Sequence, residues 1–143
     1  DQEEAKTDKQ RYLIRSEAGF ASMGSDPFGE FTATKDIKVE TYIGAIFYGK
    51  VDFQGHKITR EITKRCTAPR IFDQLEKGAV LENLVYDLTW HSYTAHSYTS
   101  AMIVHNAGTV QNLIAHFKFN NPASHIGLGG LIYDNQLVHW KTL

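Results

Sequence analysis

The chain has 143 residues, of which 42% are hydrophobic and 22% are charged, and its formal net charge is −1. These values are typical of one soluble globular domain with a single core. The mixed, nearly neutral charge gives no electrostatic reason to expect nucleic acid or an anionic membrane surface as a partner, and no apolar run approaches the ~20 residues that span a bilayer.

The N-terminal segment, residues 1–11, reads DQEEAKTDKQR and contains one alanine but no larger apolar residue. We therefore predict a flexible segment there and a single domain over residues 12–143. The chain starts at Asp1 rather than at a methionine, which fits either a removed signal peptide or a trimmed sequence. Cys66 is the one cysteine, so no internal disulfide forms.

The first half of the domain predicts a loop, a long strand and a hairpin. Gly19–Gly29 is rich in turn residues and predicts a loop. From Val39 to Phe53 apolar residues alternate with period two, which predicts a strand with one buried face. Gln54-Gly55 is a turn signal, and residues 56–64 are then expected to form the returning strand of a hairpin.

Residues 69–77 predict one short helix. Pro69 suits a first helical turn, Ile71 and Leu75 have helical spacing, and Gly78 is a natural stop.

The remainder of the chain predicts further strands. We expect strands at Val80–Trp90, Tyr93–His105 and Thr109–Phe119, and a final hairpin of residues 125–133 and 136–142 around Asp134-Asn135. Seven or eight short strands separated by turn residues favour a mainly β fold, an antiparallel barrel, with a β-sandwich as the alternative. A barrel is preferred because it leaves no long edge exposed.

The histidines predict neither a metal site nor a catalytic dyad. The chain has seven histidines but no His-x-His and no His-Glu-x-x-His motif. His91 and His96 repeat with an odd period and so face opposite sides of a strand. On a straight strand Asp87 and His91 lie ~13 Å apart, too far for direct proton transfer. His105 and His116 would meet across the predicted hairpin, which still makes no ligand set, so we expect no metal, no cofactor and no catalytic residue.

Three segments resemble the virulence-associated (Vap) proteins of pathogenic rhodococci, in the same order along the chain. They are IGAIFYGKVDFQGHK (Ile43–Lys57), GAVLENLVYDLTWHSY (Gly78–Tyr93) and IAHFKFNNPASHIGLGG (Ile114–Gly130). The resemblance implies a compact antiparallel barrel behind a mobile N-terminal segment, export from the cell and an action on the host phagosome or lysosome. It brings no catalytic residues to this chain.

Three functions follow as hypotheses. The first is an exported, non-enzymatic barrel that acts on a host membrane or a host protein; the location is then secreted or extracytoplasmic, with a cytoplasmic protein as the alternative. The second is a barrel that binds a small apolar ligand, or a cyclase or isomerase with its site inside the barrel. The third is a protein-recognition module of the immunity type. The sequence leaves the oligomeric state open.

The second hypothesis depends on polar and aromatic side chains that would line the inside of the barrel. The candidate ligand-binding residues are Tyr86, Trp90, His96, Tyr98 and His116.

Overall fold

The structure is a computed structural model, and it describes residues 10–63, 70–91, 102–119 and 132–135. These residues form two sheets and one helix, α2 (Glu17–Ser25). Sheet A has seven strands: β1 (Arg11–Ile14), β2 (Glu30–Ala33), β3 (Ile37–Lys38), β5 (Lys50–Asp52), β6 (Lys57–Ile62), β8 (Val80–Trp90) and β10 (Thr109–Phe119). Sheet B has four strands: β4 (Ile43–Phe47), β7 (Phe72–Leu75), β9 (Ile103–Asn106) and β11 (Ile132–Asn135).

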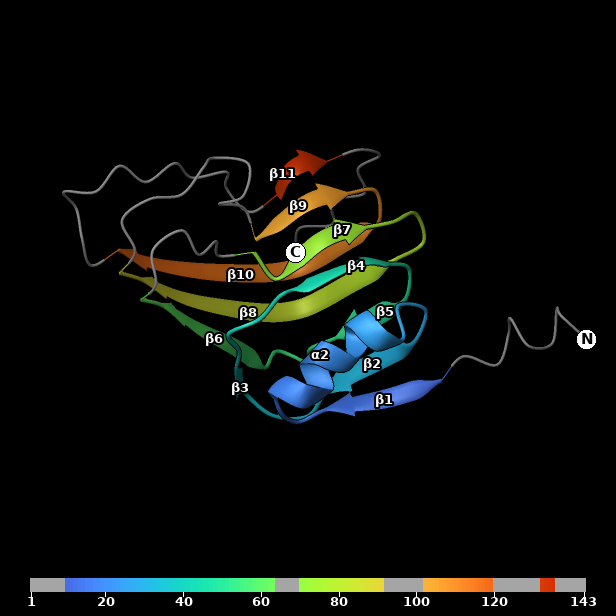
Figure 1. The fold of residues 1–143 in the computed structure, drawn as a ribbon, viewed down its shortest axis with the longest axis horizontal. Helices are drawn as coiled ribbons and strands as arrows, with labels where there is room; N and C mark the ends of the chain where they lie inside the picture. The colour runs from blue at the N-terminus through green and yellow to red at the C-terminus, as the bar shows by residue number, and fades with distance from the viewer. Residues whose placement is uncertain (1–9, 64–69, 92–101, 120–131, 136–143) are drawn as a thin grey trace, which may run out of the picture.

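All strand pairs are parallel, and each joins one turn of the chain to the next. In sheet A one row of paired residues runs through Arg11, Glu30, Lys50, Val80 and Thr109. Sheet B stacks in the same way, from β4 through β7 and β9 to β11, as Figure 1 shows. The chain therefore winds as a parallel β-helix that passes from sheet A to sheet B and back in each turn.

The predicted antiparallel barrel is wrong, because the sheets are parallel and neither closes on itself. The alternative sandwich of antiparallel sheets is wrong for the same reason. Gln54 and Gly55 do turn the chain, with φ of 51° and 79°. The strand that follows them, β6, pairs in parallel with β8 and β3 instead of returning antiparallel to β5. Apolar alternation identifies the buried face of a strand but carries no information on its partner or direction.

The long strand predicted over Val39–Phe53 is two strands, β4 and β5, in different sheets. The burial that the alternation predicts is confirmed, since Ile43, Phe47, Val51 and Phe53 are all buried. The alternation continues through the bend because both strands turn the same face to one core.

The prediction of one short helix in a mainly β fold is confirmed, but its position was wrong. Residues 72–75 of the predicted helix form β7, and the helix is α2, where a loop was predicted. Ser16 caps α2 and accepts a hydrogen bond from the amide of Gly19 at 3.3 Å. Phe20 and Met23 are fully buried. The helix contacts β1 and β4 and takes the place of a sheet B strand in the first turn (Figure 1), so burial outweighs the weak helix propensity of its glycines and serines.

The C-terminal predictions are corrected in part. Val80–Trp90 and Thr109–Phe119 are strands with the predicted bounds. β9 and β10 form no hairpin, because they belong to different sheets. Asp134 and Asn135, predicted as a turn, end β11, which pairs in parallel with β9. Residues 93–101, 125–131 and 136–142, where strands were also predicted, lie outside the described residues.

A ladder of hydrogen-bonded amide and carboxylate side chains lies where the strands of sheet A bend, and it joins three successive turns of the chain. Asn83 Nδ2 donates to Asp52 Oδ1 at 2.9 Å, and Asn112 Nδ2 donates to Asn83 Oδ1 at 2.8 Å. Asn83 and Asn112 have φ of 58° and 55°, a left-handed conformation that asparagine tolerates better than most residues. The same residue type thus bends β8 and β10 at the same level and joins the turns by hydrogen bonds.

Small residues occupy a second corner, where successive turns come close together. The pairing rows place Gly29, Gly49, Ala79 and Gly108 above one another. A Cβ added at Gly49 would lie 2.1 Å from the carbonyl oxygen of Gly29. Glycine is required at position 49 because the backbone of the preceding turn fills the space of a side chain.

Replacing Gly49 by alanine is therefore expected to lower the free energy of unfolding by about 1–3 kcal/mol, measured by urea denaturation. Gly24 in α2 is a matched control, since a Cβ there would meet nothing within 4 Å. Gly24→Ala should raise stability by up to about 1 kcal/mol through helix propensity. Equal stability of Gly49→Ala and the wild type would contradict the close approach of the two turns.

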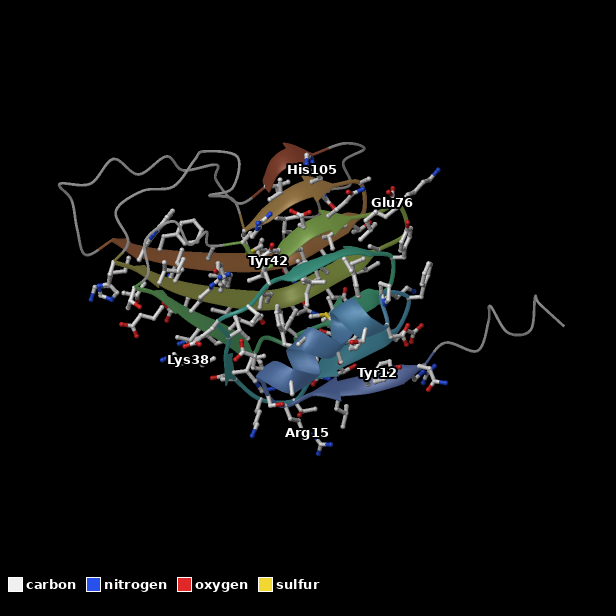
Figure 2. All side chains as sticks on the ribbon, in the orientation of Figure 1. Tyr12, Arg15, Lys38, Tyr42, Glu76 and His105 are labelled. Atoms are coloured by element: carbon white, nitrogen blue, oxygen red, sulfur yellow. The ribbon has the colours of Figure 1, made fainter. Side chains whose placement is uncertain are left out.

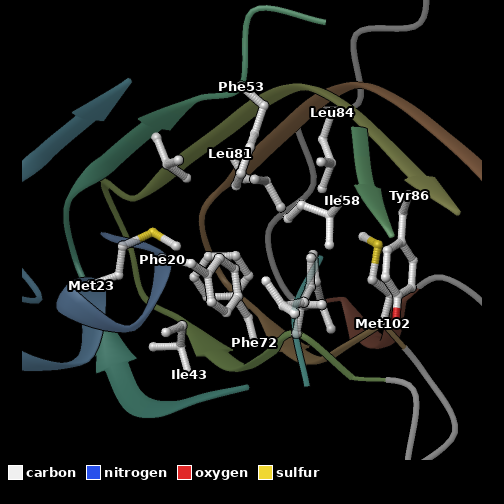
Figure 3. Packing of buried hydrophobic residues seen from close by; sticks show 14 of the residues in the cluster. Phe20, Met23, Ile43, Phe53, Ile58, Phe72, Leu81, Leu84, Tyr86 and Met102 are labelled. Carbon is white, nitrogen blue, oxygen red and sulfur yellow. The ribbon is translucent and has the colours of Figure 1, made fainter. Parts of the chain in front are cut away.

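The core lies between the two sheets and is filled by aromatic and aliphatic side chains. Phe72 of β7 packs against Phe20 of α2 and Phe47 of β4, with ring centroids 6.4 and 5.5 Å away. Figure 3 shows Phe20, Met23, Ile43 and Phe72 converging on one side of this core and Tyr86 beside Met102 on the other. The interior that would hold a ligand in a barrel is thus occupied by the protein's own side chains.

Candidate functional site

The structure does not gather the predicted ligand-binding residues into one site. Tyr86 and Trp90 are fully buried core residues of β8. His116 lies exposed on β10, on the outside of sheet A. His96 and Tyr98 lie outside the described residues. The predicted ligand site assumed the inside of a barrel, and the sheets that the structure describes form none. Tyr86 and Trp90 pack in the core instead, while a site that includes His96 and Tyr98 stays a prediction.

The phenol of Tyr86 is buried in the core. Burial raises the pKa of Tyr86 to about 12, while the charge of Arg60 acts in the opposite direction. The ring packs edge-on against Phe117 with centroids 6.2 Å apart. Both observations assign Tyr86 to the core.

Arg60 is a buried charge that the sequence did not single out. It occupies a core-facing position of β6 and is only 3% exposed. Its guanidinium donates to the carbonyl oxygens of Arg70 and of Glu40, the latter at 3.4 Å, and hydrogen-bonds with Tyr86. Arg60 therefore ties β6 to the chain entering β7 and to the connection before β4, which is a structural task.

The outer face of β6, β8 and β10, here called the polar face, carries titratable side chains in register. Two rows cross the three strands: Lys57, Val85 and Ile114 in one, and Thr59, Asp87 and His116 in the next. A third row holds Glu61, Thr89 and Lys118. These side chains stand on the side opposite the core because strand residues alternate between faces.

Two ion pairs on the polar face join neighbouring turns. Lys57 Nζ lies 3.8 Å from Asp87 Oδ2, and His91 Nε2 lies 3.0 Å from Glu61 Oε1. All four side chains are between 33% and 46% exposed, so each pair contributes little to stability. Each contact joins a basic side chain of one turn to a carboxylate of the neighbouring turn.

Asp87 and His116 are neighbours across strands, which the sequence reasoning missed. Their positions pair directly in β8 and β10, where adjacent strands lie about 4.8 Å apart. His105, the partner predicted for His116, lies instead on sheet B beside β11 (Figure 2). Among the described residues no group of three or more histidine, cysteine, aspartate or glutamate side chains is placed to hold a metal ion. The polar face thus brings a carboxylate and an imidazole into register on neighbouring strands.

Asp36 and His56 form a further pair between turns, next to β3 and β6. Asp36 Oδ1 accepts a hydrogen bond from the amide of Lys57 at 2.9 Å and lies 3.2 Å from His56 Nδ1. The backbone hydrogen bond from Lys57, followed by the hydrogen bond with His56, lowers the pKa of the Asp36 carboxyl. A carboxylate on one turn again meets a cation or potential cation on the next.

In the last turn of sheet A that the structure describes, β10, the core-facing side chains are less buried than those of β8. Leu84, Tyr86 and Leu88 of β8 are at most 1% exposed. Their register partners on β10 are only partly buried; these are Leu113, Ala115 and Phe117. Within the described part of the chain β10 pairs with β8 alone, and no described strand lies at its other edge, here called the free edge. This free edge of β10, bordered by the polar face, is the candidate functional site.

The opposite end of sheet A is protected. Its last strand, β1, has only four residues and lies against α2, and Ile14 is fully buried. Among the described residues the two ends of the β-helix therefore differ, and the β10 end combines a long edge with incompletely buried apolar side chains.

Comparisons of the chain with family models, with curated proteins and with solved structures give no match. The resemblance to the Vap proteins stays a prediction from the sequence, and the barrel that it implies is not the fold of this chain. In the part of the chain that the structure describes, no helix is long and apolar enough to span a membrane.

Proposed function

We propose that the protein is a non-enzymatic recognition module that binds a partner protein by accepting an extended segment along the free edge of β10. One observation carries this proposal. β10 has eleven residues and core-facing side chains that are only partly buried, and among the residues that the structure describes it pairs along one edge. A strand of this length with a free edge presents backbone donors and acceptors to any chain that lies beside it.

A strand added at this edge would form hydrogen bonds with the backbone of β10 and would cover its partly buried side chains. The incoming segment would pair with β10 as β10 pairs with β8, which supplies backbone hydrogen bonds. Its inward side chains would cover Leu113, Ala115 and Phe117, so that they become as buried as their partners on β8. Affinity then comes from the backbone and the apolar cover, and specificity from the outward side chains.

A protein partner agrees with the sequence-based expectation of a recognition or host-directed protein, while export and a host target remain predictions. The enzymatic alternative loses its support, because its proposed interior site depends on a barrel. The polar face carries paired, partly exposed charges, which favour recognition.

The proposal is tested by amide hydrogen exchange of the full chain with a synthetic peptide of alternating valine and threonine, a neutral strand-forming probe. Saturating peptide should slow exchange of the free-edge amides of β10 by at least about tenfold and leave β1 unchanged. Ile114 is 55% exposed on β10, so Ile114→Ala should weaken peptide binding by up to about fivefold through the lost cross-strand contact.

Leu13→Ala is the matched control, because Leu13 is 51% exposed on the other edge strand, β1. Its peptide affinity should equal that of the wild type. Two outcomes would contradict the proposal: no change in the exchange of β10, or free-edge amides that are already protected before the peptide is added.

A further inference from the structure

We propose that α2 is a movable cover of the core, which opens as a unit and is held closed by the carboxylate of Glu17. This inference is independent of strand addition at β10, because α2 contacts β1 and lies in the first turn, at the opposite end of the β-helix. It comes from the way in which α2 is attached to the rest of the fold.

The backbone hydrogen bonds of α2 lie within the helix. The amide of Phe20 donates to the carbonyl oxygen of Ser16 at 3.0 Å, and the amide of Asp26 donates to that of Ser22 at 2.9 Å. A strand of sheet A instead shares its hydrogen bonds with neighbouring turns, as β8 does with β5, β6 and β10. The helix can therefore leave the core while the ladders of both sheets stay intact.

Both ends of α2 are tied to sheet A. β1 precedes the helix and β2 follows it, and these two strands pair in register from Arg11 with Glu30 to Ile14 with Ala33. Their pairing holds the two ends of the connecting segment in place when residues 16–26 move. A segment tethered in this way opens and closes locally, without unfolding of the domain.

Two buried side chains attach α2 to the core. Phe20 and Met23 are fully buried, and Figure 3 shows them reaching from the helix toward Ile43 and Phe72. β8 buries a larger set of side chains, which are Leu81, Leu84, Tyr86, Leu88 and Trp90. Because apolar burial is the main force that holds an element in place, α2 is held less strongly than β8. The closed form is still the major state, since opening exposes both side chains to water.

The carboxylate of Glu17 joins the first turn of α2 to the connection before β4. Glu17 Oε2 accepts hydrogen bonds from the backbone amides of Glu40 at 2.6 Å and Thr41 at 3.1 Å, and from the hydroxyl of Thr41 at 3.2 Å. Hydrogen bonds to a charged acceptor are stronger than those between neutral groups. All three are exposed, so they can break and form again without disturbing the core. Glu17 therefore acts as a clasp that favours the closed form.

Opening of α2 uncovers aromatic surface in the first turn. Phe20 packs against Phe72 with ring centroids 6.4 Å apart, so its departure exposes part of the Phe72 ring. Phe72 keeps its contact with Phe47 on β4, 5.5 Å between centroids, because both belong to sheet B. The protein thereby presents an apolar surface without unfolding its sheets.

Amide hydrogen exchange of the full chain tests the cover. The amides of α2 should exchange at least about tenfold faster than those of β8, because the helix opens without unfolding of the sheets. Glu17→Gln should speed the exchange of α2 and of the amides of Glu40 and Thr41 by about threefold to tenfold and leave β8 unchanged. Glu40→Gln is the matched control, because the clasp uses the amide of Glu40 and not its side chain.

Thr41→Val separates the clasp from the interaction of the Glu17 charge with the helix dipole. It removes one donor of the clasp and keeps the carboxylate at the start of the helix. The exchange of α2 should then rise by up to about threefold.

The two methionines of the chain provide a second readout. Met23 on α2 and Met102 before β9 are both fully buried. Dilute hydrogen peroxide transfers one oxygen atom to the sulfur of an accessible methionine, which gives the sulfoxide and water. Glu17→Gln should raise the oxidation rate of Met23, measured by mass spectrometry of peptides, by the same factor as the exchange of α2. The oxidation rate of Met102 should be the same in the variant and the wild type.

Each other outcome overturns a defined part of the proposal. Equal protection of α2 and β8 would show that the helix is released only when the whole domain unfolds. Exchange of α2 and oxidation of Met23 that do not respond to Glu17→Gln would refute the clasp, and so would an equal response to Glu40→Gln. A response to Glu17→Gln without any response to Thr41→Val would assign the effect to the helix dipole instead.

Discussion

Phe72→Ala is expected to lower the free energy of unfolding by about 3–5 kcal/mol. Phe72 is fully buried and contacts both α2 and the neighbouring turn of sheet B through Phe20 and Phe47. Truncation removes apolar contacts from three elements at once and leaves a cavity that two parallel sheets cannot close without breaking register. Urea denaturation followed by circular dichroism measures the loss.

Phe28 is the matched control for this substitution. It is 57% exposed and stacks on Tyr48 with ring centroids 4.6 Å apart. Phe28→Ala should cost no more than about 1.5 kcal/mol, the range of an aromatic pair. If the two variants lose equal stability, Phe72 does not lie in the core between the two sheets as described.

Arg60→Ala should cost about 3 kcal/mol, because it leaves buried acceptors without a donor, each worth about 1–3 kcal/mol. The guanidinium donates to the carbonyl oxygens of Arg70 and Glu40 and contacts the Tyr86 hydroxyl. The side chain also fills space between the sheets, which alanine leaves empty. Thermal and urea unfolding both report this loss.

Two further substitutions separate packing from hydrogen bonding at Arg60. Arg60→Met keeps most of the buried volume but none of the donors, so its loss should lie between wild type and Arg60→Ala. Arg11→Ala removes an arginine whose side chain is 86% exposed and should change stability by less than about 1 kcal/mol. A methionine variant as stable as the wild type would show that the buried hydrogen bonds contribute nothing net.

The sequence predicts the long strands well because their burial is regular. Val80–Trp90 and Thr109–Phe119 have the predicted bounds, and the alternation across Val39–Phe53 identifies the buried residues. The direction of the strands was predicted wrongly, because a strand with one buried face has the same alternation in parallel and antiparallel sheets. The position of the helix was predicted wrongly, because α2 is stabilised by the packing of Phe20 and Met23 in the core, which local helix propensity does not reveal.

An internal repeat in the sequence indicates this topology, but the predictions above did not use it. Val80 to Leu88 reads VLENLVYDL, and Thr109 to Phe117 reads TVQNLIAHF, with the corner asparagines at the same place. Each repeat is preceded by a glycine or alanine of the small-residue corner. Repeats of this kind favour a solenoid, whereas the five-residue repeat at His91 and His96 runs mostly through residues outside the described ranges.

Only single residues of the candidate site were predictable from the sequence, and their arrangement was not. His116 was singled out from the sequence, but for the wrong environment, because it was assigned to the inside of a barrel. Its neighbour Asp87 and the free edge of β10 depend on which strands lie side by side. Register between strands distant in sequence is set by the whole fold, so no local pattern around His116 could supply it.

The ladder of Asp52, Asn83 and Asn112 also determines how the chain tolerates insertions and deletions. Losing a single residue between two rungs would shift the following corner off the ladder and turn every later side chain to the opposite face. Losing a complete coil would let the remaining coils restack with their corners aligned, because the main contacts join only adjacent coils. Length can therefore change in this molecule by whole coils far more easily than by single residues.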